Sequence, residues 1–452
     1  MILIENVHLL TMDTERHEYE HGYIAAQDKR IVAVGAGPAP DDLFADAERI
    51  VDGRGCLATP GFINTHHHLY QWVTRGLAVD STLFQWLTTL YPVWAGIDED
   101  CVRTAACGGL ARLAQTGCTT STDHHYVFPR DGGDVLGAEI EAAAEVGLRF
   151  HPTRGSMDLG QKDGGLPPDN VVEDRESILA ASADAISRWH DPSADSMLRI
   201  GLAPCSPFSV TGEVMRESAA LARAHGVHLH THLAETQDES AFCRERFGKT
   251  PLEYVESLGW IGPDVWFAHG VHFSDAEVAH LGATRTGVAH CPTSNARLGA
   301  GIARARDLRA AGARIGIGVD GAASNEACSM IDDVRHALLF ARARGGPQAL
   351  SVRDAVEMAT LGGADVLGRS DHLGSLEVGK MADIALWDLR GYAHADIADP
   401  VAALVMGSTP PVKLLLVNGI PVVEDTHVLK VDEESLAVEA ESAHRRLLER
   451  TK

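Results

Sequence analysis

The stretch Thr59-Pro60-Gly61-Phe62-Ile63-Asn64-Thr65-His66-His67-His68-Leu69-Tyr70-Gln71 places a short apolar run directly before a His-x-His pair. Successive residues of a β-strand point to opposite faces, so His66 and His68 project to one side while His67 points to the other. Two imidazoles on one rigid edge make half of a metal site. Clustered histidines are also common as surface or core polar residues, so the pair needs partners elsewhere in the chain.

The middle of the chain repeats one unit, an apolar run that ends in polar residues. Segments with helical periodicity separate these runs, and several of them stop at a glycine, namely Gly117, Gly147 and Gly226. This alternation predicts an α/β fold, a (β/α)8 barrel of the TIM type, with a doubly wound sheet as the alternative. The expected strands are 57–64, 118–125, 148–154, 198–206, 228–235, 265–271, 287–293 and 315–321, and the clearest expected helices are 100–115, 133–145, 175–189, 213–225 and 352–367.

The two ends of the chain have a different sequence pattern, in which apolar and polar residues alternate in short runs. This pattern is typical of antiparallel strands, and Asn418-Gly419 is a strong hairpin-turn signal. We therefore expect a small composite β-sandwich domain formed by both termini, with 1–58 as its first part and 373–430 as its second. The barrel then spans 59–372, and 431–452 forms a charged C-terminal helix packed on the outside.

The composition narrows the range of partners and compartments. A net charge of −24 over 452 residues disfavours nucleic acid, an anionic membrane and a polyanionic substrate, and favours a neutral or weakly charged small molecule. The eight cysteines are scattered without a paired framework, which is typical of reduced thiols. The N-terminus lacks the features of a signal peptide, and no run of 18 apolar residues occurs. We expect a soluble cytoplasmic protein.

Reactive groups in such barrels lie at the C-terminal ends of the strands. Those ends carry His66 and His68 after the first strand, His232 after the fifth, His269 after the sixth and Asp320 after the eighth. Imidazoles and a carboxylate form a compact ligand set for a divalent metal with room for water. Individually, His232 reads equally as a buried structural histidine, and Asp320 as a helix cap or turn residue. Their common place at one rim favours the metal site.

Two further observations concern the chemistry of this site. Glu235 follows His232 by three residues, where a carboxylate can carry protons between water and substrate; the alternative is a carboxylate stabilised by a helix N-terminus. No lysine occurs between Lys162 and Lys249, so strand 198–206 offers no carbamylated lysine to bridge a second metal. We expect one divalent metal ion; zinc and iron both suit the ligand set, and zinc is the preferred assignment.

These motifs resemble the amidohydrolase superfamily, specifically its mononuclear deaminase branch, over nearly the whole chain. The resemblance implies His66, His68, His232 and Asp320 as metal ligands. It also implies Glu235 as the proton shuttle, and His269 together with Asp320 as the groups that polarise or orient the water. The motifs are Pro60-Gly61-Phe62-Ile63-Asn64-Thr65-His66-His67-His68, His232-Leu233-Ala234-Glu235-Thr236, Ala268-His269-Gly270-Val271-His272, Cys291-Pro292-Thr293-Ser294-Asn295, the stretch 318–325 and the stretch 374–383.

The substrate contacts follow from the same resemblance. Gln71 matches a glutamine that guanine-type deaminases use to hold the base, and a carboxamide offers both a donor and an acceptor. The segments around Trp94, Tyr126 and Cys205 resemble most closely the deaminases that act on 8-oxoguanine, so Trp94 and Tyr126 are expected to wall a flat ring and Cys205 to face it. Core packing for Trp94 and Cys205, and capping for Gln71, are the alternatives. Cys205-Ser206-Pro207-Phe208 replaces the Arg-Phe pair of typical guanine deaminases, which disfavours guanine itself.

The expected activity is therefore hydrolytic deamination of an amino-heterocycle in purine catabolism, 8-oxoguanine to urate and ammonia, by a water that the metal activates. Isocytosine, a pterin such as isoxanthopterin and a hydroxylated s-triazine are alternative substrates. A triazine dechlorinase or cyclic amidase would use the same ligands but release a different product. A metal-binding or sugar-binding barrel without catalysis would leave Glu235 and His269 without a role. A homodimer is expected as the assembly.

Overall fold

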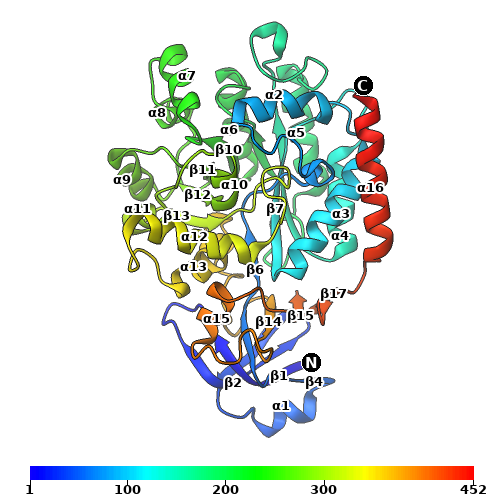
Figure 1. The fold of residues 1–452 in the computed structure, drawn as a ribbon, viewed down its shortest axis with the longest axis vertical. Coiled ribbons are helices and arrows are strands. Elements are labelled where there is room, and N and C mark those ends of the chain that lie inside the picture. Colours follow the sequence, from blue (N-terminus) through cyan, green and yellow to red (C-terminus); the bar gives the residue numbers. More distant parts are fainter. Residues whose placement is uncertain (452) are drawn as a thin grey trace.

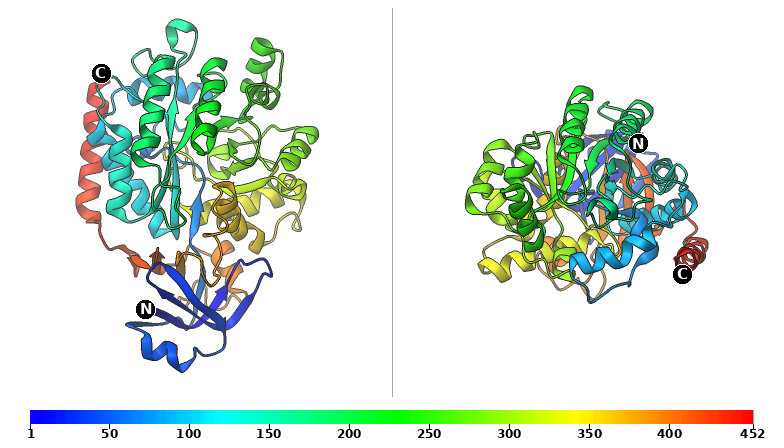
Figure 2. Two further views of the ribbon diagram at one scale, coloured as in Figure 1. Left: turned by 180° about the vertical axis from the view of Figure 1, so that it is seen from behind. Right: turned by 90° about the horizontal axis from the view of Figure 1, so that it is seen from above.

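The computed structural model describes residues 1–451, and its centre is a closed barrel of eight parallel strands. The barrel closes where Ile317 of the last strand pairs with Asn64 of the first. The predicted barrel is therefore confirmed and the doubly wound alternative is excluded; Figure 2 shows the ring of helices around it from above. The barrel strands are β6 (Phe62–Asn64), β7 (Cys118–His125), β8 (Arg149–Ser156), β9 (Gly201–Pro204), β10 (Leu229–Leu233), β11 (Val265–His269), β12 (Gly287–His290) and β13 (Arg314–Ile317).

Helices join and surround the barrel strands. Gly147 and Gly226 end two of them in the left-handed conformation, with φ of 92° and 66°, as expected for glycine stop signals. The helices around the barrel are α2 (Leu83–Trp94), α3 (Glu99–Gln115), α4 (Val135–Val146), α5 (Arg175–Trp189), α6 (Gly212–His225), α7 (Gln237–Phe247), α8 (Pro251–Glu256), α9 (Asp275–Thr284), α10 (Pro292–Arg297), α11 (Ala305–Ala311), α12 (Met330–Gly345), α13 (Val352–Ala359) and α14 (Leu361–Val366), with 3-10 turns η1 (Leu69–Thr74) and η2 (Gln161–Asp163).

The single helix expected over 352–367 is divided at Thr360, which has φ −121° and ψ −94°. The break lets two glycines approach the barrel wall closely. A Cβ on Gly362 would lie 2.3 Å from the carbonyl oxygen of Ile315, and one on Gly363 would lie 2.9 Å from Cβ of Ile63. The periodicity continues through the break because both halves bury the same face, so the pattern alone does not reveal it.

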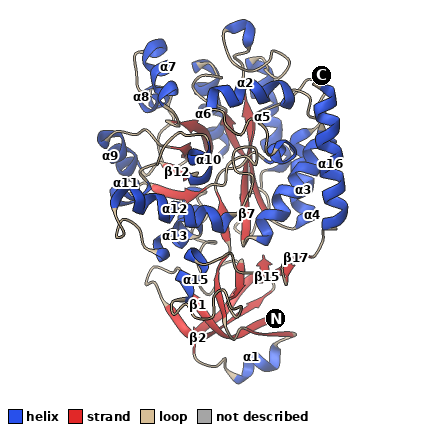
Figure 3. Ribbon diagram, viewed as in Figure 1, coloured by secondary structure: helices blue, strands red, loops and turns tan. Residues whose placement is uncertain are grey.

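The segments before and after the barrel, residues 2–60 and 384–428, form one mixed sheet of nine strands below the barrel (Figures 1 and 3). Asn418 and Gly419 form the expected hairpin turn between β15 and β16, with φ of 55° and 75°. The strands are β1 (Ile2–Leu10), β2 (Glu18–Gln27), β3 (Arg30–Ala36), β4 (Arg49–Asp52), β5 (Cys56–Pro60), β14 (Ile384–Asp388), β15 (Val412–Val417), β16 (Ile420–Glu424) and β17 (His427–Val428), with two short helices, α1 (Asp41–Asp46) and α15 (Pro400–Met406).

The apolar run 57–64, expected as one barrel strand, belongs to two sheets. Its first part is β5, which pairs with β14 of the terminal sheet, and its second part is β6 of the barrel. Gly61 makes the transition, since a Cβ there would lie 2.1 Å from the side chain of Thr119. Both halves are buried on both faces, so the hydrophobic pattern shows no boundary.

The last helix, α16 (Glu433–Arg450), runs along the outside of the barrel beside α3 (Figure 1). Its Ala443 and Leu447 are buried, and His444 donates from Nδ1 to the carbonyl of Val73 at 2.7 Å. Within residues 1–451, no helix combines the length and the apolar composition that crossing a lipid bilayer requires.

Candidate active site

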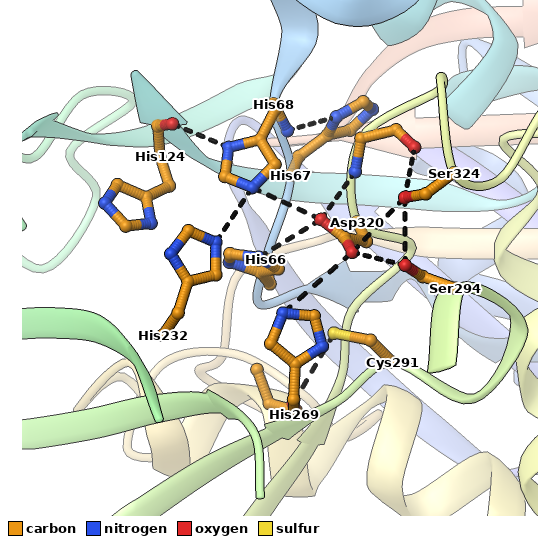
Figure 4. A network of polar contacts seen from close by, with 12 residues as sticks. His66, His67, His68, His124, His232, His269, Cys291, Ser294, Asp320 and Ser324 are labelled. Carbon is orange, nitrogen blue, oxygen red and sulfur yellow. Dashed lines mark hydrogen bonds and ion pairs between the residues drawn. The ribbon is translucent and has the colours of Figure 1, made fainter. Parts of the chain in front are cut away.

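The C-terminal ends of the barrel strands bring the five predicted groups into one cluster (Figure 4). Oδ1 of Asp320 lies 3.3 Å from Nε2 of His66 and 3.2 Å from Nε2 of His68. Nε2 of His232 lies 3.1 Å from Nε2 of His68, and Nε2 of His269 lies 4.0 Å from Oδ2 of Asp320. Positions up to 254 residues apart in the sequence thus meet at one rim, because strands β6, β10, β11 and β13 all end there.

Hydrogen bonds on the far side of each ring determine where its lone pair points. His68 donates from Nδ1 to the carbonyl of His124, and His232 donates from Nδ1 to the carbonyl of Cys205, both at 2.7 Å. A carbonyl oxygen can only accept, so the proton of each neutral ring is on Nδ1 and Nε2 carries the lone pair. Both Nε2 atoms therefore face the cluster as acceptors.

His66 has the same orientation through a second histidine. His230 donates from Nδ1 to the carbonyl of Trp266 at 2.9 Å, which leaves its Nε2 as the acceptor of the Nδ1 proton of His66 at 2.8 Å. Nε2 of His66 then has a lone pair, is buried and has no hydrogen-bond partner among the described residues. Burial lowers the pKa of both His66 and His232 well below the usual value, so both rings are neutral.

This donor set fits a divalent metal ion. Two lone pairs 3.1 Å apart, on His68 and His232, repel each other unless a cation lies between them, and Nε2 of His66 lacks any other partner. Second bonds to carbonyls and to His230 are the supports that metal-binding histidines use. His124 also belongs to this cluster: it donates from Nε2 to the carbonyl of Ala203 at 2.9 Å, and its Nδ1 lies among the possible ligand atoms.

Asp320 is held by its own loop and by the turn after β12. Ser294 donates to its Oδ2 at 2.6 Å, and the backbone N–H of Gly321 donates to its Oδ1 at 2.7 Å. Burial alone would raise the pKa of Asp320, but the close approach of the His66 and His68 rings outweighs it and holds that pKa well below the usual value. Asp320 is therefore the anionic member of the cluster.

Glu235 and His269 form the acid–base side of the cluster. Oε2 of Glu235 lies 3.6 Å from Nε2 of His269, whose Nδ1 donates to Oδ1 of Asn295 at 2.9 Å. Burial, and then the negative charge of Asp320, raises the pKa of Glu235 well above the usual value, which favours the protonated form of this carboxyl. Glu239 fixes the turn, since its carboxylate accepts from the backbone N–H groups of Ala234 and Glu235 at 2.9 and 2.8 Å.

A small cavity opens directly above these groups. Three of the residues expected to contact the substrate, Gln71, Tyr126 and Cys205, line this cavity. Neither the carbonyl oxygen nor the amide nitrogen of the Gln71 side chain has a hydrogen-bond partner among the described residues. A buried carboxamide without partners is one that a ligand can satisfy. The lining is His68, Gln71, Leu83, Trp86, Leu87, Tyr91, Tyr126, Cys205, Phe208, His232, Glu235, His269, Leu298 and Asp320.

Comparison with known proteins agrees with this geometry, since residues 57–422 match the model of the amidohydrolase family. The chain belongs to the amidohydrolase family. The chain is 46% identical to 8-oxoguanine deaminase of Pseudomonas aeruginosa, covering 88% of each chain. It is 40% identical to hydroxydechloroatrazine ethylaminohydrolase of Pseudomonas sp. strain ADP, covering 88% of this chain and 84% of that one. Among solved structures, atrazine chlorohydrolase of Arthrobacter aurescens TC1 complexed with zinc superposes with a TM-score of 0.93 at 33% identity, covering 98% and 100%.

One predicted substrate contact of this amidohydrolase lies elsewhere. Trp94 does not line the cavity; it is fully buried behind it, packed on Tyr70 and Trp86, and donates from Nε1 to Oγ1 of Thr74 at 3.1 Å. Trp86 and Tyr91 of the same helix take the place expected for it. The aromatic residues of α2 are all buried or partly buried, and the sequence does not show which of them line the cavity. That depends on how the helix packs over the barrel end.

Several functional residues of the amidohydrolase site were not predicted. Ser294 and Asn295 stand in a motif that pointed to the family without revealing their roles, which are to bind Asp320 and His269. His230 lies two residues before His232, and the period of two in a strand indicates that both side chains share one face. The apolar residues of α2, together with Phe208 and Leu298, carried no signal beyond core periodicity.

Proposed function

We propose that this amidohydrolase is a hydrolytic deaminase of amino-heterocycles and that its substrate is 8-oxoguanine, which it converts to urate and ammonia. The observation that carries this proposal is that Glu235, a buried carboxyl with a raised pKa, lines the same small cavity as the partner-free carboxamide of Gln71. One group can give a proton to a ring nitrogen while the other holds an amide-like ring edge. The 46% identity to an 8-oxoguanine deaminase supports the choice of ring.

The cavity lining favours a flat neutral ring. Tyr91, Tyr126, Trp86 and Phe208 present aromatic surface, and no lysine or arginine is among the described lining residues. A phosphate or carboxylate on the substrate would have no cation to pair with, and burying such a group unpaired is costly. Leu83 and Leu87 of α2 add to the apolar wall, which suits a free base.

We propose that His66, His68, His232 and Asp320 hold one zinc ion. The orientation of the three Nε2 lone pairs toward Asp320 supports this ligand set, and the related chlorohydrolase structure contains zinc. When bound, such an ion supplies the nucleophile by lowering the pKa of a water molecule toward neutrality. The deamination then exchanges the amino group of the ring for the oxygen of that water.

The residues of the chain provide the proton transfers. Gln71 orients the ring, and Glu235 donates its proton to the ring nitrogen next to the carbon that carries the amino group. Asp320 and His269 accept and orient the proton that the attacking water gives up, because Oδ2 of Asp320 and Nε2 of His269 face each other at 4.0 Å. Glu235 takes the second proton of that water and passes it to the amine, which leaves as ammonia while the ring carbon keeps the oxygen. The first water proton, held by Asp320 and His269, then returns to Glu235 and restores the site.

A second candidate is an aminohydrolase of the same branch that acts on a hydroxylated s-triazine, isocytosine or isoxanthopterin. The 40% identity to hydroxydechloroatrazine ethylaminohydrolase favours the triazine member of this group. A triazine with an alkylamino group would release an alkylamine instead of ammonia, so the two candidates differ in product.

The test is a screen of the purified, zinc-loaded protein against 8-oxoguanine, guanine, isocytosine, isoxanthopterin and N-alkylated hydroxytriazines. Ammonia and alkylamine release are measured together with urate absorbance. We expect 8-oxoguanine to have the highest kcat/KM and guanine a much lower one. A higher kcat/KM for any other ring would replace 8-oxoguanine as the substrate, and no release from any ring would refute the deaminase proposal.

A further inference from the structure

The opposite end of the barrel contains a buried cation without a counter-charge. Arg369, which follows α14, is 1% exposed and forms no ion pair with any carboxylate of residues 1–451. Its Nη2 donates to the carbonyls of Ala194 and Ser196 at 3.1 and 3.0 Å. No described protein atom accepts from its Nε or its Nη1. A guanidinium buried with three free N–H bonds, one on Nε and two on Nη1, is costly unless an acceptor such as an anion reaches them.

Further basic side chains face the same place. His151 of β8 is 2% exposed, and neither of its ring nitrogens has a partner among the described residues; Nδ1 of His228 has none either. The rings of His151 and His228 lie 6.3 Å apart, and His228 abuts the backbone of Gly368, where a Cβ would lie 2.6 Å from the imidazole. The buried His151 of β8 and the partly exposed His228, just before β10, therefore lie beside the segment that carries Arg369.

Asp383, a carboxylate that acts on Arg369, is already paired with another arginine. Asp383 accepts from Nη2 of Arg149 at 3.1 Å and from the backbone of Asn418 at 2.7 Å, so the charge of Arg149 is balanced. Arg149 and Arg369 also share the carbonyl of Ser196. Burial first, and then repulsion from Arg149 and Arg199, lowers the pKa of Arg369 to about 9, so Arg369 remains charged at neutral pH. One positive charge is left over.

We propose that Arg369, His151 and His228 form a binding site for a small inorganic anion at the N-terminal end of the barrel, where the barrel meets the terminal sheet. The ligand class is a halide or a small oxyanion, because charge-assisted hydrogen bonds from a guanidinium and imidazole N–H groups suit a compact negative charge. The anion balances Arg369 and joins the barrel to the sheet through Arg149 and Asp383. It lies one layer below the metal cluster, since Trp266 contacts His151, His228 and also His230.

The matched control is Arg314. It is equally buried and also forms no ion pair with a described carboxylate, but its Nε, Nη1 and Nη2 donate to the carbonyls of Arg285, Asp365 and Val265 at 2.6, 2.8 and 3.3 Å. All of its nitrogens are therefore matched by protein. Arg314→Met removes a buried cation whose N–H groups are all matched by protein carbonyls, so its loss takes away no free donor.

The experiment measures Tm of the zinc-loaded protein in sodium bromide and in sodium gluconate at the same ionic strength. A ligand that binds only the folded state raises Tm, and we expect bromide to give a rise of about 2 °C over gluconate for a chain of this size. Arg369→Met should lose that difference while Arg314→Met keeps it, with metal content unchanged in both. Crystals soaked in bromide should show an anomalous peak in contact with the Arg369 guanidinium.

Three outcomes would overturn the proposal: equal Tm in the two salts, an equal bromide effect in Arg369→Met, or water alone at this position in the bromide-soaked crystals. The wild-type crystal experiment decides the question even if Arg369→Met fails to fold. The proposal is independent of the deaminase function, because none of these readouts uses a substrate.

Discussion

His66 donates from Nδ1 to Nε2 of His230 across 2.8 Å, and His230 donates in turn to the carbonyl of Trp266. The relay keeps the lone pair of His66 on Nε2, where it faces Asp320. His230→Ala removes the acceptor, so we expect metal affinity to fall about 10- to 100-fold, as for other supporting partners of metal-binding histidines. Competition with a chromogenic chelator measures it. His290→Ala, another buried histidine of the barrel, is the control; equal affinity in both variants would contradict the relay.

Among the described residues that line the cavity, Glu235 and Asp320 alone carry a carboxyl group. Glu235→Gln keeps the shape of the side chain but cannot transfer a proton. We expect kcat to fall by about 10²- to 10⁴-fold, the usual contribution of a general acid–base group. Metal content, measured by atomic absorption, should stay at the wild-type value because Glu235 is not in the ligand set. A near-normal kcat would remove Glu235 from the mechanism.

Gly321 allows the carboxamide of Gln71 to lie against the Asp320 loop. A Cβ on Gly321 would lie 1.9 Å from Oε1 of Gln71, so Gly321→Ala must displace the amide. Losing its hydrogen bonds to the ring should raise KM about tenfold, which corresponds to roughly 1.4 kcal/mol. Gln71→Ala should have a similar effect. If the two substitutions act through one contact, the free-energy change from KM in the double variant will be smaller than the sum of the two single changes. Full additivity of these changes would refute this explanation.

Trp86 and Trp94 provide a matched pair on one helix. Trp86 lines the cavity, whereas Trp94 lies behind it and donates to Thr74. We expect Trp86→Phe to change KM. Trp94→Phe should leave KM unchanged and lower the free energy of unfolding by about 1–2 kcal/mol, because the hydrogen bond to Thr74 is lost and the ring is smaller. Steady-state kinetics and urea denaturation separate the two effects. A changed KM for Trp94→Phe alone would restore Trp94 as a substrate contact.

Asp333 makes stability depend on pH. Burial raises the pKa of this carboxyl from 3.8 to about 7, and its oxygens accept from Thr293 and Asn325. Between these two values the unfolded chain releases the proton that the folded protein keeps, so the free energy of unfolding falls as pH rises toward 7. Asp333→Asn should remove a decline on the order of a few kcal/mol. Denaturation at pH 5, 6, 7 and 8 measures the difference between the two proteins, and parallel curves would contradict the assignment.

The barrel, and the gathering of histidines and Asp320 at one rim, could be predicted from short stretches of the sequence. Strands and helices leave periodic patterns, and the ends of successive parallel strands share one rim, so His66, His232 and Asp320 could be placed together without coordinates. The points at which helices break leave no such periodic signal. The division of 352–367 at Thr360 depends on how closely Gly362 approaches the carbonyl of Ile315, a contact between distant segments.

Sequence alone therefore determined the alternation of elements, the family motifs and the groups at the strand ends, because these are properties of short stretches of chain. Tertiary structure decided which aromatic residues of α2 line the cavity, where 57–64 passes from one sheet to the other, and how His230 orients His66. Each of these depends on the angle and depth at which separate elements pack. Side chains that are all buried look alike in a hydrophobic pattern, and only the packed structure separates the cavity wall from the core behind it.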